Sequence, residues 1–312
     1  MTALAPTPAS RRRVRRGRAV PWLMLGPAIV LFAVFMAAPI AYTLVLSFQR
    51  SVVTGLGLGS GSRSTVFAGL DNYVAALGDP DFLASAGRVG LYGLVLVPTM
   101  LGLALLFALL LDSRRTRLRA FSRITIFLPY AVPAVISSLL WGFLYLPAVS
   151  PFYDVADALG IRLPEVLSGD IVILAVANIA LWGGVGFNMI IMYTSLRSIP
   201  SDIYEAATLD GASETQIALR IKIPIILPSL IMTAIFSMIA TLQVFAEPTT
   251  LKPLSNSISS VFTPLMKVYR DAFTRNDVYS ASATSIVIAV VTFLLSFVFL
   301  RVVQRRAFGG EG

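Results

Sequence analysis

The sequence of 312 residues contains no cysteine and no histidine. Disulfide bonds, thiol nucleophiles, zinc sites built from Cys and His, and histidine acid–base chemistry are therefore excluded. Charged residues are also scarce, at 13% of the chain, whereas hydrophobic residues make up 56%. A typical soluble domain carries about 25% charged residues. The composition therefore indicates a chain whose solvent is a lipid bilayer.

The chain has only three lysines, Lys222, Lys252 and Lys267, and none follows the glycine that a phosphate-binding loop requires. The pattern G-x-x-x-x-G-K-[ST], whose backbone N–H groups and lysine hold nucleotide phosphates, does not occur. We therefore expect no ATPase activity, no catalytic residues, no metal site and no cofactor in this chain.

Six apolar segments are long enough to cross about 30 Å of hydrocarbon. They cover residues 20–48, 86–111, 124–146, 171–195, 225–246 and 281–303. We expect an all-α polytopic membrane protein, with a disordered basic N-terminus at 1–19, a six-helix domain at 20–303 and a tail at 304–312. Its first apolar run exceeds the roughly 7–15 residues of a cleavable signal core, which predicts an uncleaved signal anchor. Pro129 and Pro133 are expected to kink the third span.

The net charge of +9 indicates topology rather than nucleic-acid binding, because the arginines flank apolar segments. Seventeen of the 25 basic residues lie before the first predicted span, after the second or fourth, or from Arg301 onward at the end of the sixth. Short cytoplasmic segments are enriched in Lys and Arg. We therefore expect a multi-pass protein of the cell membrane with both termini in the cytoplasm.

One polar, patterned segment lies between the fourth and fifth spans, on the expected cytoplasmic side. Ser201 or Asp202 could cap a short helix that ends near Leu209, and Gly211 supplies a glycine stop. Ser213 and Gln216 then stand at capping-box spacing. Pro224 is expected to break the chain before the fifth span. The segment therefore predicts a helix-turn-helix elbow that contacts a soluble partner.

This elbow, at 196–224, resembles the EAA loop of binding-protein-dependent ABC importer permeases. The matching residues are Glu205, Ala206, Ala207, Asp210, Gly211, Ala212, Ile221, Ile223 and Pro224. The family often has a bulky aromatic residue in the second helix of the loop, where this chain has Ala218. The resemblance implies that the elbow couples the subunit to an ATPase.

Two further segments resemble the carbohydrate-uptake branch of this family. They are the GLDNY string at 69–73 and the LPY-x-x-P pattern at 128–133. With the arginine-rich start, they are closest to the F-type subunit of maltose permeases. The resemblance implies a type I ABC importer permease fold and the uptake of a sugar or oligosaccharide. It also implies a second, G-type permease, two cytoplasmic ABC ATPase subunits that hold ATP and Mg, and an extracellular solute-binding protein.

A sugar crossing the bilayer needs hydrogen-bond partners and apolar ring faces, because an unmade hydrogen bond is costly in a dry interior. The resemblance places cavity residues near the GFN and QVF strings. The substrate-path candidates are Asn178, Trp182, Asn188, Gln243, Phe245 and Glu247. Glu247 could equally be a charge at headgroup level, and the three amides could equally be packing residues. Ser229, Thr233, Ser237 and Thr241 recur every four residues, a spacing that favours helix packing.

Two other classes of function fit an apolar chain with a polar elbow. A secondary transporter would need ionisable residues inside its spans, and the predicted spans hold almost none apart from Arg88 near an end. A membrane scaffold or enzyme would use the elbow as a regulatory surface.

Overall fold

A computed structural model describes residues 19–53, 63–113 and 116–308 of the chain. The chain divides into two units, Met1–Val45 and Leu46–Gly312. The predicted basic N-terminus lies outside the described residues, apart from Ala19.

The first unit is an apolar helical rod. It contains α1 (Ala19–Phe32), a π-helical turn η1 (Ala33–Ala37) and most of α2 (Ala38–Ser47). Trp22–Ser47 is long and apolar enough to span a membrane, and its large apolar side chains are exposed. An apolar helix of this length that buries almost nothing within its own chain suits a lipid environment. The first predicted span is therefore confirmed.

The second unit begins with a small hairpin, the one departure from all-α structure in the described part of the chain. Strands β1 (Gln49–Val53) and β2 (Arg63–Phe67) pair antiparallel, with Gln49 opposite Phe67. The GLDNY string follows and opens α3 (Asp71–Gly78). The Asn72 side chain donates to the carbonyl oxygens of Ser47 (2.9 Å) and Gln49 (2.7 Å). This amide fixes the start of the hairpin against the helix that carries the string.

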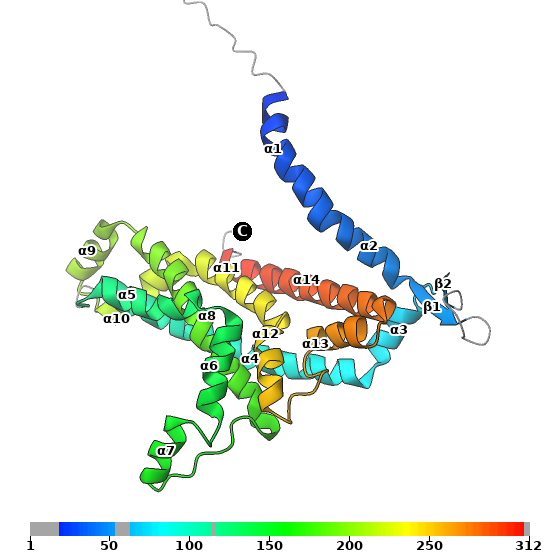
Figure 1. Cartoon of the computed structure of the whole chain (residues 1–312). Helices are drawn as coiled ribbons and strands as arrows, with labels where there is room; N and C mark the ends of the chain where they lie inside the picture. The colour runs from blue at the N-terminus through cyan, green and yellow to red at the C-terminus, as the bar shows by residue number, and fades with distance from the viewer. Residues whose placement is uncertain (1–18, 54–62, 114–115, 309–312) are drawn as a thin grey trace, which may run out of the picture. The chain divides into compact units, whose positions relative to one another are not determined.

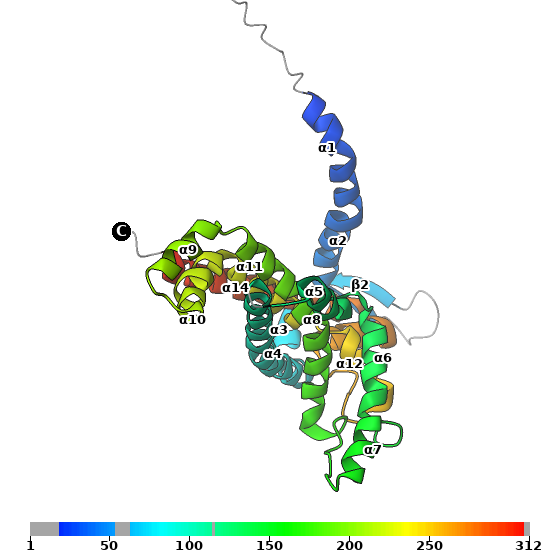
Figure 2. The same cartoon turned by 90° about the vertical axis from the view of Figure 1, so that its left-hand side faces the viewer.

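The N-terminal half of the membrane domain is built on two long helices, α4 and α8 (Figures 1 and 2). In chain order its elements are α4 (Pro80–Asp112), α5 (Arg119–Phe127), η2 (Leu128–Ala131), α6 (Ala134–Tyr145), α7 (Pro151–Ala158), η3 (Gly169–Ile171) and α8 (Val172–Arg197). The second and fourth predicted spans correspond to α4 and α8. In both views α9 (Ser201–Leu209) and α10 (Glu214–Ile217) lie at one end of the second unit, far from α7.

The third predicted span is not one kinked helix. Arg119–Ala131 and Ala134–Tyr145 meet at a bend of 97°. Val132, which precedes Pro133, has φ −83° and ψ 125°. A proline disfavours the helical conformation in the residue before it, so the chain leaves the helix at Val132 and restarts after the proline. Pro133 thus divides the span instead of kinking one helix, whereas Pro129 lies within η2.

The C-terminal half holds the elbow and the last two predicted spans. Its elements are α9 (Ser201–Leu209), α10 (Glu214–Ile217), the π turn η4 (Ala218–Lys222), α11 (Ile223–Leu242), α12 (Ala246–Leu251), η5 (Lys252–Leu254), α13 (Pro264–Tyr269), the π turn η6 (Arg270–Thr274) and α14 (Val278–Phe308). The fifth predicted span is interrupted, because α11 ends at Leu242. The sixth predicted span lies within α14, whose apolar span-length part is Val278–Val303, and the helix itself continues to Phe308. Residues 309–312 lie outside the described residues.

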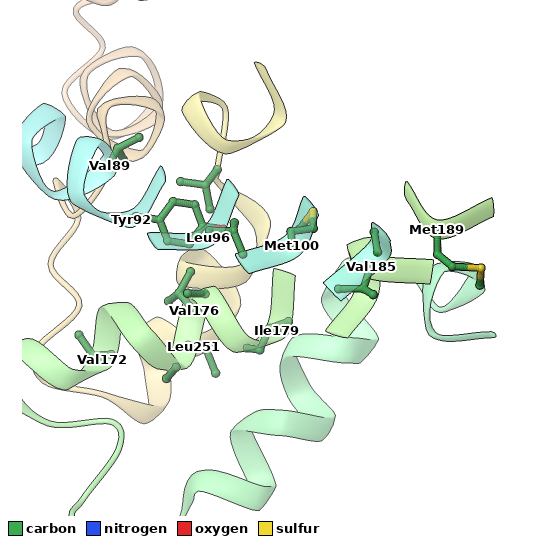
Figure 3. Close-up of a cluster of buried hydrophobic side chains, with 14 of the residues drawn as sticks. Val89, Tyr92, Leu96, Met100, Val172, Val176, Ile179, Val185, Met189 and Leu251 are labelled. Atoms are coloured by element: carbon green, nitrogen blue, oxygen red, sulfur yellow. The ribbon is translucent and has the colours of Figure 1, made fainter. Parts of the chain in front are cut away.

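Within the described residues, five helices are long and apolar enough to cross a membrane, or six if the bent pair counts as one span. The core of the second unit lies between α4 and α8. Tyr92, Leu96 and Met100 of α4 are buried against Val176 and Ile179 of α8 (Figure 3). Four-residue spacing keeps the α4 side chains on one face of the helix.

A cluster of ion pairs fixes the start of α4 to α13 and η6. The Lys267 ammonium is buried, 3.0 Å from the Asp79 carboxylate and 2.7 Å from that of Asp271. Asp79 also caps α4, accepting from the backbone N–H of Asp81 at 2.8 Å. Burial alone would raise the pKa of Asp79, but Lys267 and these backbone donors hold it below its usual value.

Candidate functional site: a polar elbow and a membrane cavity

The first elbow helix, α9, begins without the predicted side-chain cap. Pro200 occupies the N-cap position, and Ser201 is already the first helical residue. The Ser201 hydroxyl donates to the Asp202 carboxylate at 3.4 Å instead of capping the helix. The prediction that Ser201 or Asp202 caps α9 was therefore wrong. The extended φ and ψ of Pro200 (−57°, 138°) let the helix begin directly after it.

The glycine stop is confirmed, with a complete pattern of hydrogen bonds. Gly211 has φ 81°, in the left-handed region. The N–H of Ala212 bonds to the Ala207 carbonyl (3.0 Å), and the N–H of Gly211 bonds to that of Thr208 (3.1 Å). This pair is the Schellman motif, which satisfies the last carbonyls of a helix. Three residues of the EAA and DGA strings, Ala207, Gly211 and Ala212, therefore close one tight turn together with Thr208.

The second elbow helix starts with the predicted capping box. The Ser213 hydroxyl accepts from the Gln216 N–H (3.3 Å), and the Gln216 side chain accepts from the Ser213 N–H (2.8 Å). The predicted break at Pro224 is wrong, because helical backbone runs from α10 through η4 into α11. A π turn departs from the usual i→i−4 bonding. Pro224, which has no N–H to donate, is the second residue after that turn, in the first turn of α11.

The outer surface of the elbow combines charged and apolar exposed side chains. Glu205 and Asp210 are exposed, and Leu209 is 89% exposed. Ala207, Ala212 and Ile221 are partly buried beneath them. Leu209 thus adds one exposed apolar side chain to a surface that otherwise carries the carboxylates of Glu205 and Asp210.

The inner face of the elbow contacts the end of α4. The Lys222 ammonium lies 2.5 Å from the Asp112 carboxylate and 4.8 Å from the centre of the Tyr204 ring. Burial and the nearby Asp112 carboxylate raise the pKa of Tyr204 to about 12, although Arg197 acts in the opposite direction. The phenol is therefore neutral at physiological pH and donates to the Leu196 carbonyl at 3.5 Å.

A cavity of about 740 Å³ lies in the membrane domain of the second unit. Its walls come from α4, from the bend of the third span (residues 126–134, the third-span bend), from α8 and α11, and from the interruption after Leu242. The polar or ring-bearing residues that line it are Tyr92, Tyr130, Ser137, Phe187, Asn188, Phe236, Ser237, Thr241, Gln243, Phe245 and Glu247. The volume is in the range of pockets that hold small organic ligands.

Two amides in the cavity wall differ in how much hydrogen-bonding capacity they retain. Asn188 is buried, and its side-chain nitrogen donates to the Met100 sulfur (3.1 Å) and the Gly184 carbonyl (3.0 Å). Its oxygen accepts from Ser237 at 3.4 Å. Gln243 is exposed, and its side-chain amide makes no hydrogen bond to the described part of the chain, whereas its backbone N–H donates to the Ala240 carbonyl. Gln243 therefore presents an unused donor and acceptor to the cavity, whereas Asn188 is largely committed to the wall.

Aromatic rings form two groups in and beside the cavity. Tyr130 stacks on Phe187 with ring centres 4.7 Å apart. Phe245 contacts Tyr269 (5.6 Å), which contacts Phe273 (4.9 Å). Both groups offer flat apolar faces near hydrogen-bonding side chains, an arrangement suited to a ligand with both ring faces and polar edges.

The cavity brings together four of the six predicted substrate-path residues, namely Asn188, Gln243, Phe245 and Glu247. Asn178 instead donates to the Tyr145 hydroxyl at 2.8 Å, and the Trp182 ring contacts that of Trp141 at 6.1 Å. These two residues pack α8 against α6 and do not line the cavity. Sequence reasoning missed Tyr92 and Met100, whose signal was their four-residue spacing with Leu96.

Three glycines of α8 lie beside the cavity, and one is required by close packing. A β-carbon on Gly186 would lie 2.3 Å from the Ile126 carbonyl oxygen and 2.7 Å from the Phe127 Cα. Neighbouring Phe187 and Asn188 line the cavity. The missing side chain thus lets α8 meet the third-span bend closely enough to form the cavity wall.

The bundle of apolar helices, the cavity among them and the exposed elbow are features of a membrane transport subunit. Residues 100–308 match the family model described as "Binding-protein-dependent transport system inner membrane component". The chain belongs to this family. It is accordingly a multi-pass inner-membrane permease subunit of an ABC importer that works with a binding protein, and ATP hydrolysis belongs to separate subunits.

Individual relatives agree with this assignment. The chain is 28% identical over 295 residues to the sn-glycerol-3-phosphate transport system permease protein UgpA of Agrobacterium fabrum (strain C58 / ATCC 33970), covering 93% of this chain and 97% of the relative. It is 30% identical over 292 residues to the probable ABC transporter permease protein YurN of Bacillus subtilis (strain 168), covering 91% and 95%. The predicted class of protein is confirmed, and the alternatives of a secondary transporter and a membrane scaffold or enzyme are set aside.

The fold is also found in a solved transporter. A chain of a bacterial alginate ABC transporter, crystallised with an alginate pentasaccharide-bound periplasmic protein, superposes with a TM-score of 0.79. The two chains are 19% identical, and the match covers 92% of this chain and 95% of the other. The predicted type I importer permease fold is confirmed.

Proposed function

We propose that this subunit passes a sugar or oligosaccharide through the cavity between the third-span bend and α11. The observation that carries the proposal is the joint presence of an unused amide, hydroxyls and aromatic faces in one membrane-embedded cavity. A polyol that leaves water needs replacement hydrogen bonds, and its ring faces pack well on aromatic side chains. The solved alginate transporter, crystallised with a pentasaccharide-bound periplasmic protein, agrees with this substrate class, and UgpA is named for sn-glycerol-3-phosphate, a phosphorylated polyol.

The arrangement of partners follows the family resemblance. A second, G-type permease would complete the substrate path, and two ABC ATPase subunits would bind ATP and Mg beneath the elbow. The basic residues that flank the spans support cytoplasmic placement of both termini and of the elbow. The shape of α9 and α10, with Leu209 and Glu205 exposed, supports docking of an ATPase there. Closure of the ATPases would then move the helices that form the cavity.

The geometry separates the roles of the two cavity amides. Gln243 has its full hydrogen-bonding capacity available, so we assign it direct contact with substrate hydroxyls. Asn188 already bonds to Met100, Gly184 and Ser237, so we assign it to holding the wall. Glu247 lies four residues after Gln243, on the same lining segment, and gives that end of the cavity its acidic character.

The test is transport by the complete complex in lipid vesicles, with the binding protein and a panel of labelled mono- and oligosaccharides. Gln243→Ala should weaken apparent substrate affinity by about 5- to 150-fold, the equivalent of roughly 1–3 kcal/mol for a lost hydrogen bond to substrate. Asn256→Ala is the matched control, because Asn256 is an exposed amide outside the cavity. Equal apparent affinities in the two variants, for every sugar transported, would contradict the assignment.

A further inference from the structure

The buried carboxylate of Asp112 joins the elbow to α4. Asp112 is the last residue of α4, and its side chain is only 4% exposed. Its Oδ2 atom lies 2.5 Å from the Lys222 Nζ, and its Oδ1 atom lies 4.0 Å from a guanidinium nitrogen of Arg197. Lys222 belongs to η4 of the elbow, and Arg197 ends α8. One carboxylate therefore connects three segments that are far apart in the sequence.

Lys222 is enclosed in a way that makes this contact specific. Its side chain is 14% exposed, and its ammonium also faces the Tyr204 ring of α9. An ammonium loses hydration when it is buried, so it needs the carboxylate and the ring face to replace water. Arg220, two residues earlier on the same π turn, is exposed and has no ion pair in the described part of the chain. The π turn thus directs one of its two cations inward.

The helix that carries Asp112 also forms one wall of the cavity. Tyr92, Leu96 and Met100 line the cavity from α4. Ala104 and Ala108 continue the same face at four-residue spacing, and both are completely buried. A row of alanines allows α4 to pack closely against its neighbours, and the helix is continuous from Asp112 to Met100, on the Asp112 side of the internal Pro98. Displacement of Asp112 by the elbow would therefore reach the cavity wall.

We propose that Asp112 is a positioning residue for coupling, and that its pair with Lys222 transmits movement of the elbow to the α4 wall of the cavity. This inference rests on the proposed function, in which an ATPase moves the elbow. The pair supplies a fixed joint at the inner face of the elbow, opposite the exposed surface that contains Leu209 and Glu205. Arg197 and Tyr204 hold the two members of the pair in register.

The absence of native cysteine allows a direct test, because a single introduced cysteine is the only thiol of this subunit. Leu96→Cys places it on the α4 wall of the cavity. In the assembled complex in lipid, its rate of labelling by a maleimide should change several-fold between the ATP-free and ATP-bound states. Lys222→Met should remove this dependence on ATP, and Lys222→Arg should retain it. Arg123→Met is the matched control, because Arg123 is an exposed cation of α5 outside the elbow and the cavity.

Binding-protein-stimulated ATP hydrolysis, measured per assembled complex, gives the second readout. Asp112→Asn and Lys222→Met should each lower it at least tenfold, and the double variant should be no worse than the singles, because the singles each leave one unpaired buried group. Wild-type stimulation and ATP-dependent labelling in Lys222→Met would overturn the inference. Loss of assembly in all neutralised variants would assign the pair to folding and would overturn it equally. Gly211→Leu distinguishes failure of this inference from failure of the proposed function. If Gly211→Leu also leaves the stimulated ATP hydrolysis unchanged, the elbow does not couple the ATPase to this subunit and the proposed function fails.

Discussion

Gly183, Gly184 and Gly186 of α8 allow the packing at the cavity wall to be tested. Replacing each by alanine should change the free energy of unfolding with a sign that depends on what the added methyl group touches. A β-carbon on Gly186 would meet backbone atoms of α5 at 2.3 and 2.7 Å, and backbone cannot be relieved by a change of rotamer. A β-carbon on Gly183 would meet no atom within 4 Å. Both residues lie within the same helix. Alanine at these two positions therefore differs mainly in what the added methyl group touches.

The expected magnitudes follow from these distances. Gly183→Ala should stabilise the subunit by about 0.5–1 kcal/mol, because alanine loses less backbone entropy than glycine in a helix. Gly186→Ala should destabilise it by about 1–3 kcal/mol, the usual cost of overpacking a filled interior. The bend near Phe127 must then move away from α8, which disturbs the stack of Tyr130 on Phe187. Gly184→Ala should be intermediate, because the nearest group is the flexible Met100 side chain.

The assay is unfolding of the purified subunit in one detergent, followed by circular dichroism with increasing denaturing detergent. Sugar uptake by reconstituted complexes provides the functional readout, and it should fall for Gly186→Ala alone. A Gly186→Ala variant as stable as Gly183→Ala would refute the close approach of α8 and the third-span bend.

Three further predictions concern the elbow, the topology and the ion cluster. Gly211→Leu should abolish ATP-driven uptake although the subunit still inserts into the membrane. Gly211→Asn should retain most of the uptake, because asparagine tolerates positive φ better than leucine. Similar uptake by both variants would contradict a conformational role of Gly211. A reporter active only in the cytoplasm should function when inserted at Ser213 and fail at Asn256, and activity at Asn256 would reverse the orientation. Asp79→Asn should lower the melting temperature at pH 7, and the difference from wild type should shrink below about pH 4. The pKa of Asp79 is lower in the folded than in the unfolded chain, so its carboxylate stabilises the fold above the unfolded pKa of about 3.9, and this stabilisation is lost as pH falls. A difference independent of pH would count against the ion pair with Lys267.

Local signals in the sequence predicted local structure well. The capping box at Ser213 and the glycine stop at Gly211 depend on hydrogen bonds between residues only a few positions apart. Such bonds form in any context that lets the helix begin or end there. The cap at Ser201 was predicted wrongly, because Pro200 already provided an extended residue at the helix start.

The interruptions inside apolar runs could not be predicted in the same way. Hydropathy continues through Gln243 to Ala246, yet α11 ends at Leu242 because the chain turns there to form the cavity wall. Pro224 shows the opposite error, since the π turn before it keeps the helix continuous. Length and polarity alone do not distinguish these cases.

The direction in which a polar side chain of a membrane helix points could also not be predicted from the sequence. A membrane helix that is apolar on all faces gives no amphipathic pattern to orient it. Asn178 and Asn188 therefore looked equivalent in the sequence, although the first bonds to Tyr145 and the second lines the cavity. Asp112 and Lys222 are 110 positions apart, and only the tertiary fold brings them together.

The unbroken passage from the elbow into α11 makes the second elbow helix and the fifth span a single lever. Between Glu214 and Leu242 the helical backbone continues without a loop, and Gln243 follows its far end. At 1.5 Å per residue this lever is on the order of 40 Å long. A tilt of about 5° at the elbow would displace its other end by about 3 Å, a little more than the length of one hydrogen bond. Under the proposed function, small rotations of the elbow would thereby be amplified into displacements large enough to make or break contact between Gln243 and a substrate hydroxyl.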